Sequence, residues 1–171
     1  MKFEFTDIIP LNLTTKAVCI SGSQSYNLDN TRYLLRINDE GNYSEVFEIK
    51  YEYHCSPFEE ADILGNILAV GHEAHFYLFN LTKNKNILTI PMRGYFGHLY
   101  IRDNSFYVCD AGSLIRLNRD GDILWHAKSL GIDGVTIESF DYGKIFGSGE
   151  WDPPGGWKDF ILDNTTGVII K

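Results

Sequence analysis

The stretch GHLYIRDNSFYVCDAGSLIRLNRDGDILWHA, residues 97–127, decides the fold of this chain. Its apolar runs are separated by pairs of turn-forming residues: Asp103–Asn104, Ala111–Gly112 and Asp120–Gly121. Asp-Gly between apolar runs is a strong hairpin signal, because both residues tolerate a positive φ angle. The stretch therefore predicts a four-stranded antiparallel meander.

The same pattern recurs along the chain. In each unit the middle strand ends in Asn or Asp, at residues 38, 80, 118 and 163, so the steps are 42, 38 and 45 residues. A period near forty, with turn signals inside each unit, is typical of β-propeller blades or similar stacked β-repeats. We expect an all-β fold of four antiparallel meander repeats, a small or partial β-propeller-like structure. Residues 1–171 are expected to form one domain, with units at about 8–50, 58–90, 97–127 and 134–171.

Three points of organisation stay open. Residues 56–64, SPFEEADIL, fit a helical turn, or strands around a Gly65–Asn66 turn. The terminal segments KFEFT (2–6) and GVIIK (167–171) could close a ring of four units. Alternatively they could pair two chains edge to edge in a homodimer, because an unclosed meander leaves unpaired strand edges.

Units three and four resemble the repeats of PQQ-type (quinoprotein-like) and WD-like β-propellers. The resemblance rests on FYVCDAGSLIRLNRDGDILW (106–125) and FILDNTTGVII (160–170), where a strand ends in Asn or Asp before an Asp-Gly or Thr-Gly turn. Only Trp125 fills the Trp position of such repeats, and no residues match a quinone-binding or calcium-binding set. The resemblance implies a fold but no activity, since propellers host many unrelated functions.

Composition narrows the class of protein. The formal net charge is −8, and the fifteen basic residues are scattered, which argues against nucleic-acid binding. No apolar stretch is long enough to span a membrane, and the first sixteen residues lack the apolar region of a signal peptide. Cys19, Cys55 and Cys109 show no disulfide spacing, and Cys19 and Cys109 lie in apolar strand patterns that predict burial. We therefore expect a reduced, cytoplasmic protein.

The turns between the second and third strands should gather at one end of the molecule, because repeats place corresponding turns on the same face. These turns are unequal in length. Binding surfaces usually lie on elaborated loops at one end of a regular repeat scaffold. Ring closure would bring the two longest, residues 21–31 and 147–157, together. The candidate binding residues on these turns are Tyr26, His72, Glu73, Asp110, Glu150, Trp151, Asp152 and Trp157.

The loop Glu150–Trp157 is the most unusual of them, with two Trp, a Pro pair and a Gly pair. Trp is enriched at interface hot spots, although either ring could instead plug the core. His72 and His75 are three residues apart in a hairpin turn, so we expect exposed turn residues and no metal site. No activated Ser or Cys is found.

The leading hypothesis is a non-catalytic protein that binds a protein partner through one loop face. Its acidity and size fit a bacterial immunity or inhibitor protein that neutralises a basic toxin. One alternative is a lectin-like domain for a carbohydrate or another small molecule. Another is a hydrolase that uses Asp110, Glu150 and Asp152. No cofactor is expected.

Overall fold

The chain folds into sheets only. The computed structural model describes residues 2–11, 13, 16–22 and 28–170, and these residues form β-strands and no helix. The strands belong to four sheets that follow one another along the chain. The predicted all-β, propeller-like fold of repeated units is confirmed, and residues 59–64 form a strand in place of a helical turn.

The second and third sheets are complete meanders, whereas the first and fourth depart from that pattern. The first sheet has the order β1-β3-β4-β2, in which β2 runs parallel to β4. The strands of the first two sheets are β1 (Lys2–Thr6), β2 (Val18–Cys19), β3 (Asn30–Ile37), β4 (Tyr43–Tyr51), β5 (Glu59–Leu64), β6 (Ile67–His72), β7 (His75–Asn80) and β8 (Lys85–Pro91). Those of the last two are β9 (Phe96–Arg102), β10 (Ser105–Asp110), β11 (Ser113–Leu117), β12 (Ile123–Lys128), β13 (Val135–Asp141), β14 (Lys144–Glu150) and β15 (Trp157–Asp163).

Tight turns form where the sequence predicts them. Asp103 and Asn104 join β9 to β10 with φ angles of 48° and 57°, and Gly65 joins β5 to β6 with a φ of 66°. Positive φ at both central residues is the geometry of a type I′ turn, whose twist matches that of the strands.

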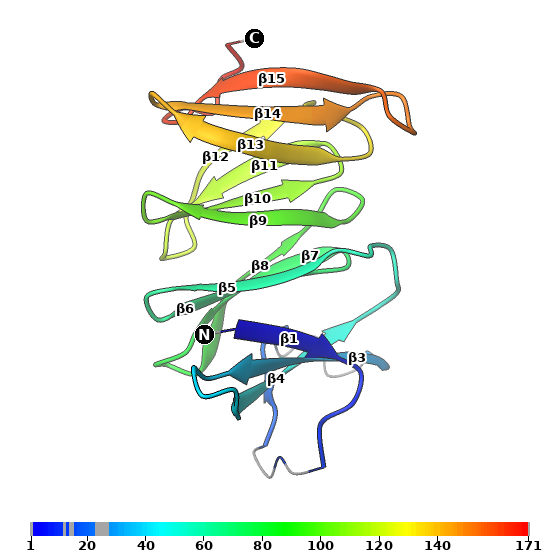
Figure 1. The fold of residues 1–171 in the computed structure, drawn as a ribbon, viewed down its shortest axis with the longest axis vertical. Coiled ribbons are helices and arrows are strands. Elements are labelled where there is room, and N and C mark those ends of the chain that lie inside the picture. Colours follow the sequence, from blue (N-terminus) through cyan, green and yellow to red (C-terminus); the bar gives the residue numbers. More distant parts are fainter. Residues whose placement is uncertain (1, 12, 14–15, 23–27, 171) are drawn as a thin grey trace.

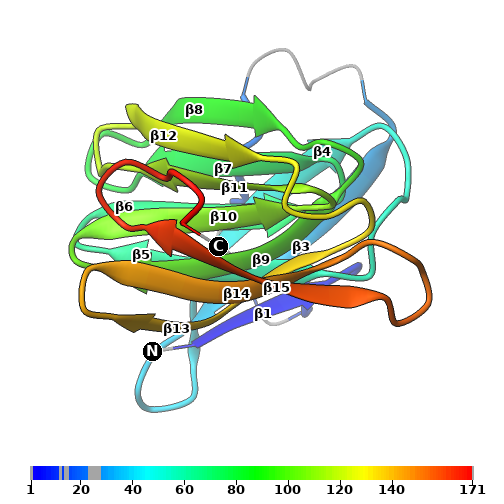
Figure 2. The same ribbon diagram turned by 90° about the horizontal axis from the view of Figure 1, so that it is seen from above.

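The four sheets form an open stack (Figures 1 and 2). The N-terminal and C-terminal sheets lie at opposite ends of it, so the ring closure expected to bring the loops at 21–31 and 147–157 together does not occur among the described residues (Figure 1). Strand β1 pairs with β3 of its own sheet, from Lys2 opposite Ile37 to Thr6 opposite Tyr33, and does not complete the fourth sheet. The fourth sheet has three strands and an isolated bridge between Leu162 and Ile169. That two chains pair through these edges stays a prediction.

The core consists of three apolar clusters, one between each pair of neighbouring sheets. Burial of each large side chain contributes about 1.5–3 kcal/mol, so the sheet-to-sheet contacts dominate the stability. The predicted burial of the cysteines is confirmed for Cys109 and wrong for Cys19, which is partly exposed, as is Cys55. Ring pairs that pack across two sheets are Phe47 with Phe79, and Tyr107 with Phe140.

The molecule has two contrasting ends. One end includes the connections between sheets, and we call it the "loop end". It is formed by residues 52–58, 72–75, 92–95, 110–113, 129–134 and 150–157. We call "turn end" the opposite one, formed by residues 38–42, 65–66, 81–84, 103–104, 118–122, 142–143 and 164–167. In Figure 1 the β14–β15 loop marks the loop end on the right. All the described candidate binding residues lie at the loop end.

Candidate functional site

A buried carboxylate at the end of the second strand ties each middle sheet to the connection that precedes it. Asp110 is 2% exposed, and its Oδ2 accepts a hydrogen bond from the Arg93 N–H at 3.0 Å. Its Oδ1 accepts from the N–H groups of Gly112 and Ser113 at 2.9 and 2.6 Å. Both oxygens of Asp110 are therefore engaged by backbone N–H groups. Of the three carboxylates in the hydrolase hypothesis, Glu150 and Asp152 remain accessible.

Glu73 has the same role in the second sheet. It is 5% exposed, and one oxygen accepts hydrogen bonds from the N–H groups of Cys55 and Ser56. The other oxygen lies 3.0 Å from Nδ1 of His54. Burial alone would raise the pKa of Glu73, but these bonds outweigh it and hold the pKa below its usual value. Glu73 is therefore an ionised anchor of the connection at 52–58.

His72 is buried, so the expectation that both turn histidines are exposed is wrong for this residue. It is 3% exposed, and its ring lies against Phe5 at 6.4 Å and Tyr51 at 4.7 Å between centroids. The burial follows from the pairing of β1 within the first sheet, which places Phe5 beside the second sheet. Burial lowers the pKa of His72 to about 4, so the ring is neutral at pH 7. His75 is partly exposed.

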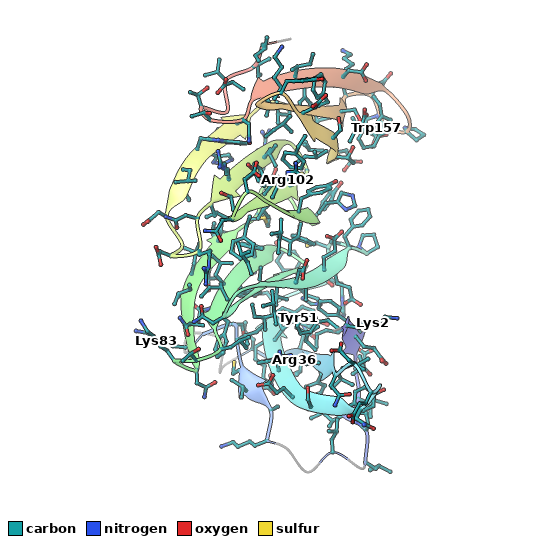
Figure 3. All side chains as sticks on the ribbon, turned by 60° about the vertical axis from the view of Figure 1, so that its left-hand side comes forward. Lys2, Arg36, Tyr51, Lys83, Arg102 and Trp157 are labelled. Atoms are coloured by element: carbon teal, nitrogen blue, oxygen red, sulfur yellow. The ribbon has the colours of Figure 1, made fainter. Side chains whose placement is uncertain are left out.

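The loop after β14 exposes one tryptophan and partly covers the other. Trp157 is 45% exposed at the edge of the C-terminal sheet (Figure 3), and its ring lies against Gly134. A Cβ atom at Gly134 would come within 3.0 Å of that ring. Trp151 is partly buried, and Lys158 Nζ lies 5.5 Å from its ring centroid. Trp157 is thus a surface residue rather than a core plug.

Hydrogen bonds within the loop at 150–157, and one to a neighbouring connection, fix its conformation. The N–H of Trp151 donates to the carbonyl of Gly156 at 2.9 Å, and the Gly155 N–H donates to Glu150 Oε1 at 2.6 Å. The Glu150 carbonyl accepts from Ile132 N–H at 2.7 Å, which joins the loop to the connection at 129–134. Asp152 is exposed. Tyr26 lies outside the described residues.

Sequence reasoning missed two aromatic residues at the loop end. Phe58 and Tyr95 each directly precede the first strand of their sheet, and their rings stack at 6.2 Å with an interplanar angle of 25°. The equivalent position in the fourth sheet is Gly134, whose missing side chain leaves space for the Trp157 ring. We call Phe58, Tyr95 and Trp157 the aromatic row. Aligning the units on the start of the first strand, rather than on the middle strand, would have found its first two members.

The aromatic row is flanked by unpaired acids. Among the described residues, Asp133, Glu150 and Asp152 form no ion pair, whereas Glu59, Glu60 and Glu73 lie against Arg32, His98 and His54. The Tyr95 hydroxyl donates to the carbonyl and to Oδ1 of Asp133, at 2.7 and 3.3 Å. Burial, followed by the charges of Asp133 and Glu150, raises the pKa of Tyr95 to about 12. Tyr95, the middle member of the row, therefore lies close to two carboxylates.

An apolar hollow of about 290 Å³ lies beside Trp151 and is lined also by Leu130, Lys158, Phe160 and Ile169. In the part of the chain that the structure covers, no three His, Cys, Asp or Glu residues are grouped so that they could hold a metal ion. None of the described segments is a helix long and apolar enough to cross a membrane.

Comparison with known proteins agrees with this architecture. BamB from Moraxella catarrhalis, a PQQ-like β-propeller, superposes with a TM-score of 0.54 at 10% sequence identity. The fold is propeller-like. The match covers 81% of this chain and 42% of BamB, so the chain spans less than half the length of that protein.

A second solved structure, Hsv2 from Kluyvelomyces marxianus, covers 82% of this chain and 57% of its own. Its TM-score is 0.38, at 8% identity. Neither a protein-family model nor a curated protein matches the chain. The comparisons therefore establish the fold class and no particular family.

Proposed function

We propose that this chain is a protein-binding module that holds a protein partner at its loop end. The observation that carries the proposal is the aromatic row, in which Phe58, Tyr95 and Trp157 offer partly exposed rings on neighbouring sheets. Large aromatic side chains dominate binding energies at protein interfaces, because they bury much area at little cost in conformational entropy.

The scaffold supports this use of the surface. The connections that carry Phe58 and Tyr95 are anchored by Glu73 and Asp110, whose oxygens accept backbone N–H groups in those same connections. A surface that is ordered before binding loses less entropy when a partner docks. Propeller-like folds serve many unrelated functions, so it is the exposed aromatic surface, and not the fold, that supports protein binding.

The finer part of the proposal is an inhibitor or immunity-type role against a basic protein. The net charge of −8 and the unpaired carboxylates of Asp133, Glu150 and Asp152 favour a cationic partner. Opposite charges steer association and raise the rate of encounter, an effect that weakens as salt is added.

The test is affinity capture from source cells with the wild-type protein and the double variant Tyr95→Ser/Trp157→Ser. Tyr142→Asn is the matched control, because Tyr142 is 92% exposed at the turn end. We expect one partner to be captured by the wild type and the control, and at least about tenfold less of it by the double variant. Equal capture by all three proteins would refute the proposal, provided that circular dichroism shows the double variant to be folded.

A sugar is the second candidate ligand, since the exposed ring of Trp157 lies beside the carboxylates of Asp133 and Glu150. A thermal-shift panel of glycans separates the two functions. A glycan that raises the melting temperature of the wild type, but not that of Trp157→Ser, would favour the carbohydrate.

A further inference from the structure

We infer that the aromatic row binds arginine side chains presented by an extended segment of the partner protein. This inference rests on the proposed function and assigns the chemistry that the same surface recognises.

The spacing of the rings matches an extended peptide. The centroids of Phe58 and Tyr95 are 6.2 Å apart. Alternate residues of an extended strand point to the same side and are about 6.6 Å apart. A strand laid along Phe58 and Tyr95 would therefore bring two alternate side chains over these two rings.

Arginine fits both the rings and the acids. Its planar guanidinium stacks on aromatic faces and is more weakly hydrated than the ammonium group of lysine. Phe58 is 39% exposed and Trp157 is 45% exposed, so each ring is partly accessible although Phe58 also contacts Tyr95 and His98. A guanidinium over Tyr95 or Trp157 would also lie close to a carboxylate, with which it can form two parallel hydrogen bonds.

The carboxylates are available for such a pair. Asp133 is exposed, and the bond from Tyr95 engages its Oδ1 only. Glu150 uses Oε1 for the Gly155 N–H. No described cation neutralises either acid. Their charges are thus free to meet a cationic partner.

Neither Arg93 nor Lys158, two cations near the loop end, forms an ion pair with Asp133 or Glu150. A Cβ atom at Gly112 would lie 3.3 Å from an Arg93 guanidinium nitrogen, so that side chain extends toward Gly112. Lys158 lies over the ring of Trp151. The aromatic row therefore meets acids on its flank, and a phosphate-rich ligand would be repelled by them.

The probe for a direct test is the peptide acetyl-Ser-Arg-Ser-Arg-Ser-Arg-Ser-amide. Its counterpart carries citrulline, which keeps the shape of arginine without the charge. Binding is followed by tryptophan fluorescence and, independently, by calorimetry. We expect the citrulline peptide to bind at least about tenfold more weakly, and the affinity of the arginine peptide to fall as salt rises. A lysine peptide should fall between the two.

The matched protein variants are Asp133→Asn/Glu150→Gln at the loop end and Asp120→Asn/Asp141→Asn at the turn end. Both pairs remove the same charge, and both Gln and Asn can still accept the hydrogen bonds described above. We expect the first pair to weaken the arginine peptide about tenfold and the second to leave it within about twofold. Equal binding of the arginine and citrulline peptides, equal effects of the two pairs, or no binding at about 1 mM peptide would each overturn the inference.

Affinity capture from source cells, repeated with both sets of variants, distinguishes failure of the arginine inference from failure of the proposed protein-binding function. If capture depends on Tyr95 and Trp157 but not on Asp133 and Glu150, the protein-binding function stands and the arginine inference fails. If capture is indifferent to the aromatic residues as well, the proposed function itself fails.

Discussion

The loop end and the turn end are built from the same strands, yet they satisfy their backbone groups in different ways. At the turn end local bonds shape the turns: the side-chain oxygen of Asn118 accepts the N–H groups of Asp120 and Asp122, both at 2.9 Å. At the loop end Asp110 reaches back to Arg93 in another connection. The conformation of a turn such as 118–122 is therefore set by nearby residues, whereas the anchoring of the connections at the loop end depends on how the sheets stack.

Glycines show the same contrast. At the turn end Gly143 has a φ of +71° and nothing within 4 Å of where a Cβ atom would be. Near the loop end Gly149 has no such φ, but a Cβ atom there would lie 1.9 Å from the carbonyl oxygen of Leu130. Gly143 is needed for the backbone conformation of a turn, whereas Gly149 is needed because two segments approach closely.

The largest expected effect comes from this pair of glycines. Gly149→Ala should lower the free energy of unfolding by about 3 kcal/mol or more, because backbone atoms of Leu130 must move. Gly143→Ala should cost about 1 kcal/mol, the penalty for a side chain in the left-handed region. Urea denaturation of both variants measures the difference. Equal losses would mean that the two ends are not built in the way described here.

The next effect concerns the buried carboxylate. Asp110→Ala leaves three N–H groups without their acceptor and should cost about 3 kcal/mol. Asp110→Asn keeps one acceptor oxygen and should cost less. Asp120→Ala is the control, since this exposed turn residue should change stability by no more than about 0.5 kcal/mol. Should Asp110→Ala unfold at the same urea concentration as the wild type, the anchoring role is wrong.

The contrast also explains what could be predicted from the sequence. Asp103–Asn104 and Gly65–Asn66 carry their turn chemistry in the residues themselves, so the strands and the repeat could be found without a structure. Aligning the units on their first strands would have matched the positions of Phe58 and Tyr95, but not the stacking of their rings, which depends on how the two sheets pack.

The candidate site was predicted in part. The loop around Trp157 was located correctly at one end of the repeat, but the burial of His72 depends on where β1 pairs. The sequence left that pairing open between ring closure and another chain. Likewise, the acidic residues of the turns look alike in sequence, although Asp110 is buried and Asp133 is exposed.

The smallest expected effect is a dependence of stability on pH that originates at the loop end. His72 is buried and its pKa is lowered to about 4, against an ordinary value of 6.5. Between pH 6.5 and pH 4 the unfolded chain binds a proton that the folded chain does not, so stability is complete above pH 6.5 and is lost as the pH falls. A shift of this size corresponds to at most about 3 kcal/mol, with most of it lost above pH 4.5.

His72→Phe should flatten this profile, because phenylalanine keeps the contacts with Phe5 and Tyr51 and does not titrate. His126 is the control, since burial and Lys128 also lower its pKa, and His126→Asn should flatten the profile less. Glu73, whose pKa is lowered, acts below pH 4.5, where its protonation removes further stability in the wild type and in both variants. Urea unfolding at half-unit steps from pH 7 to pH 4 separates the two ranges. A wild-type profile that is flat above pH 4.5 would show that proton uptake by His72 is not coupled to unfolding. The pH dependence would then not originate at the loop end.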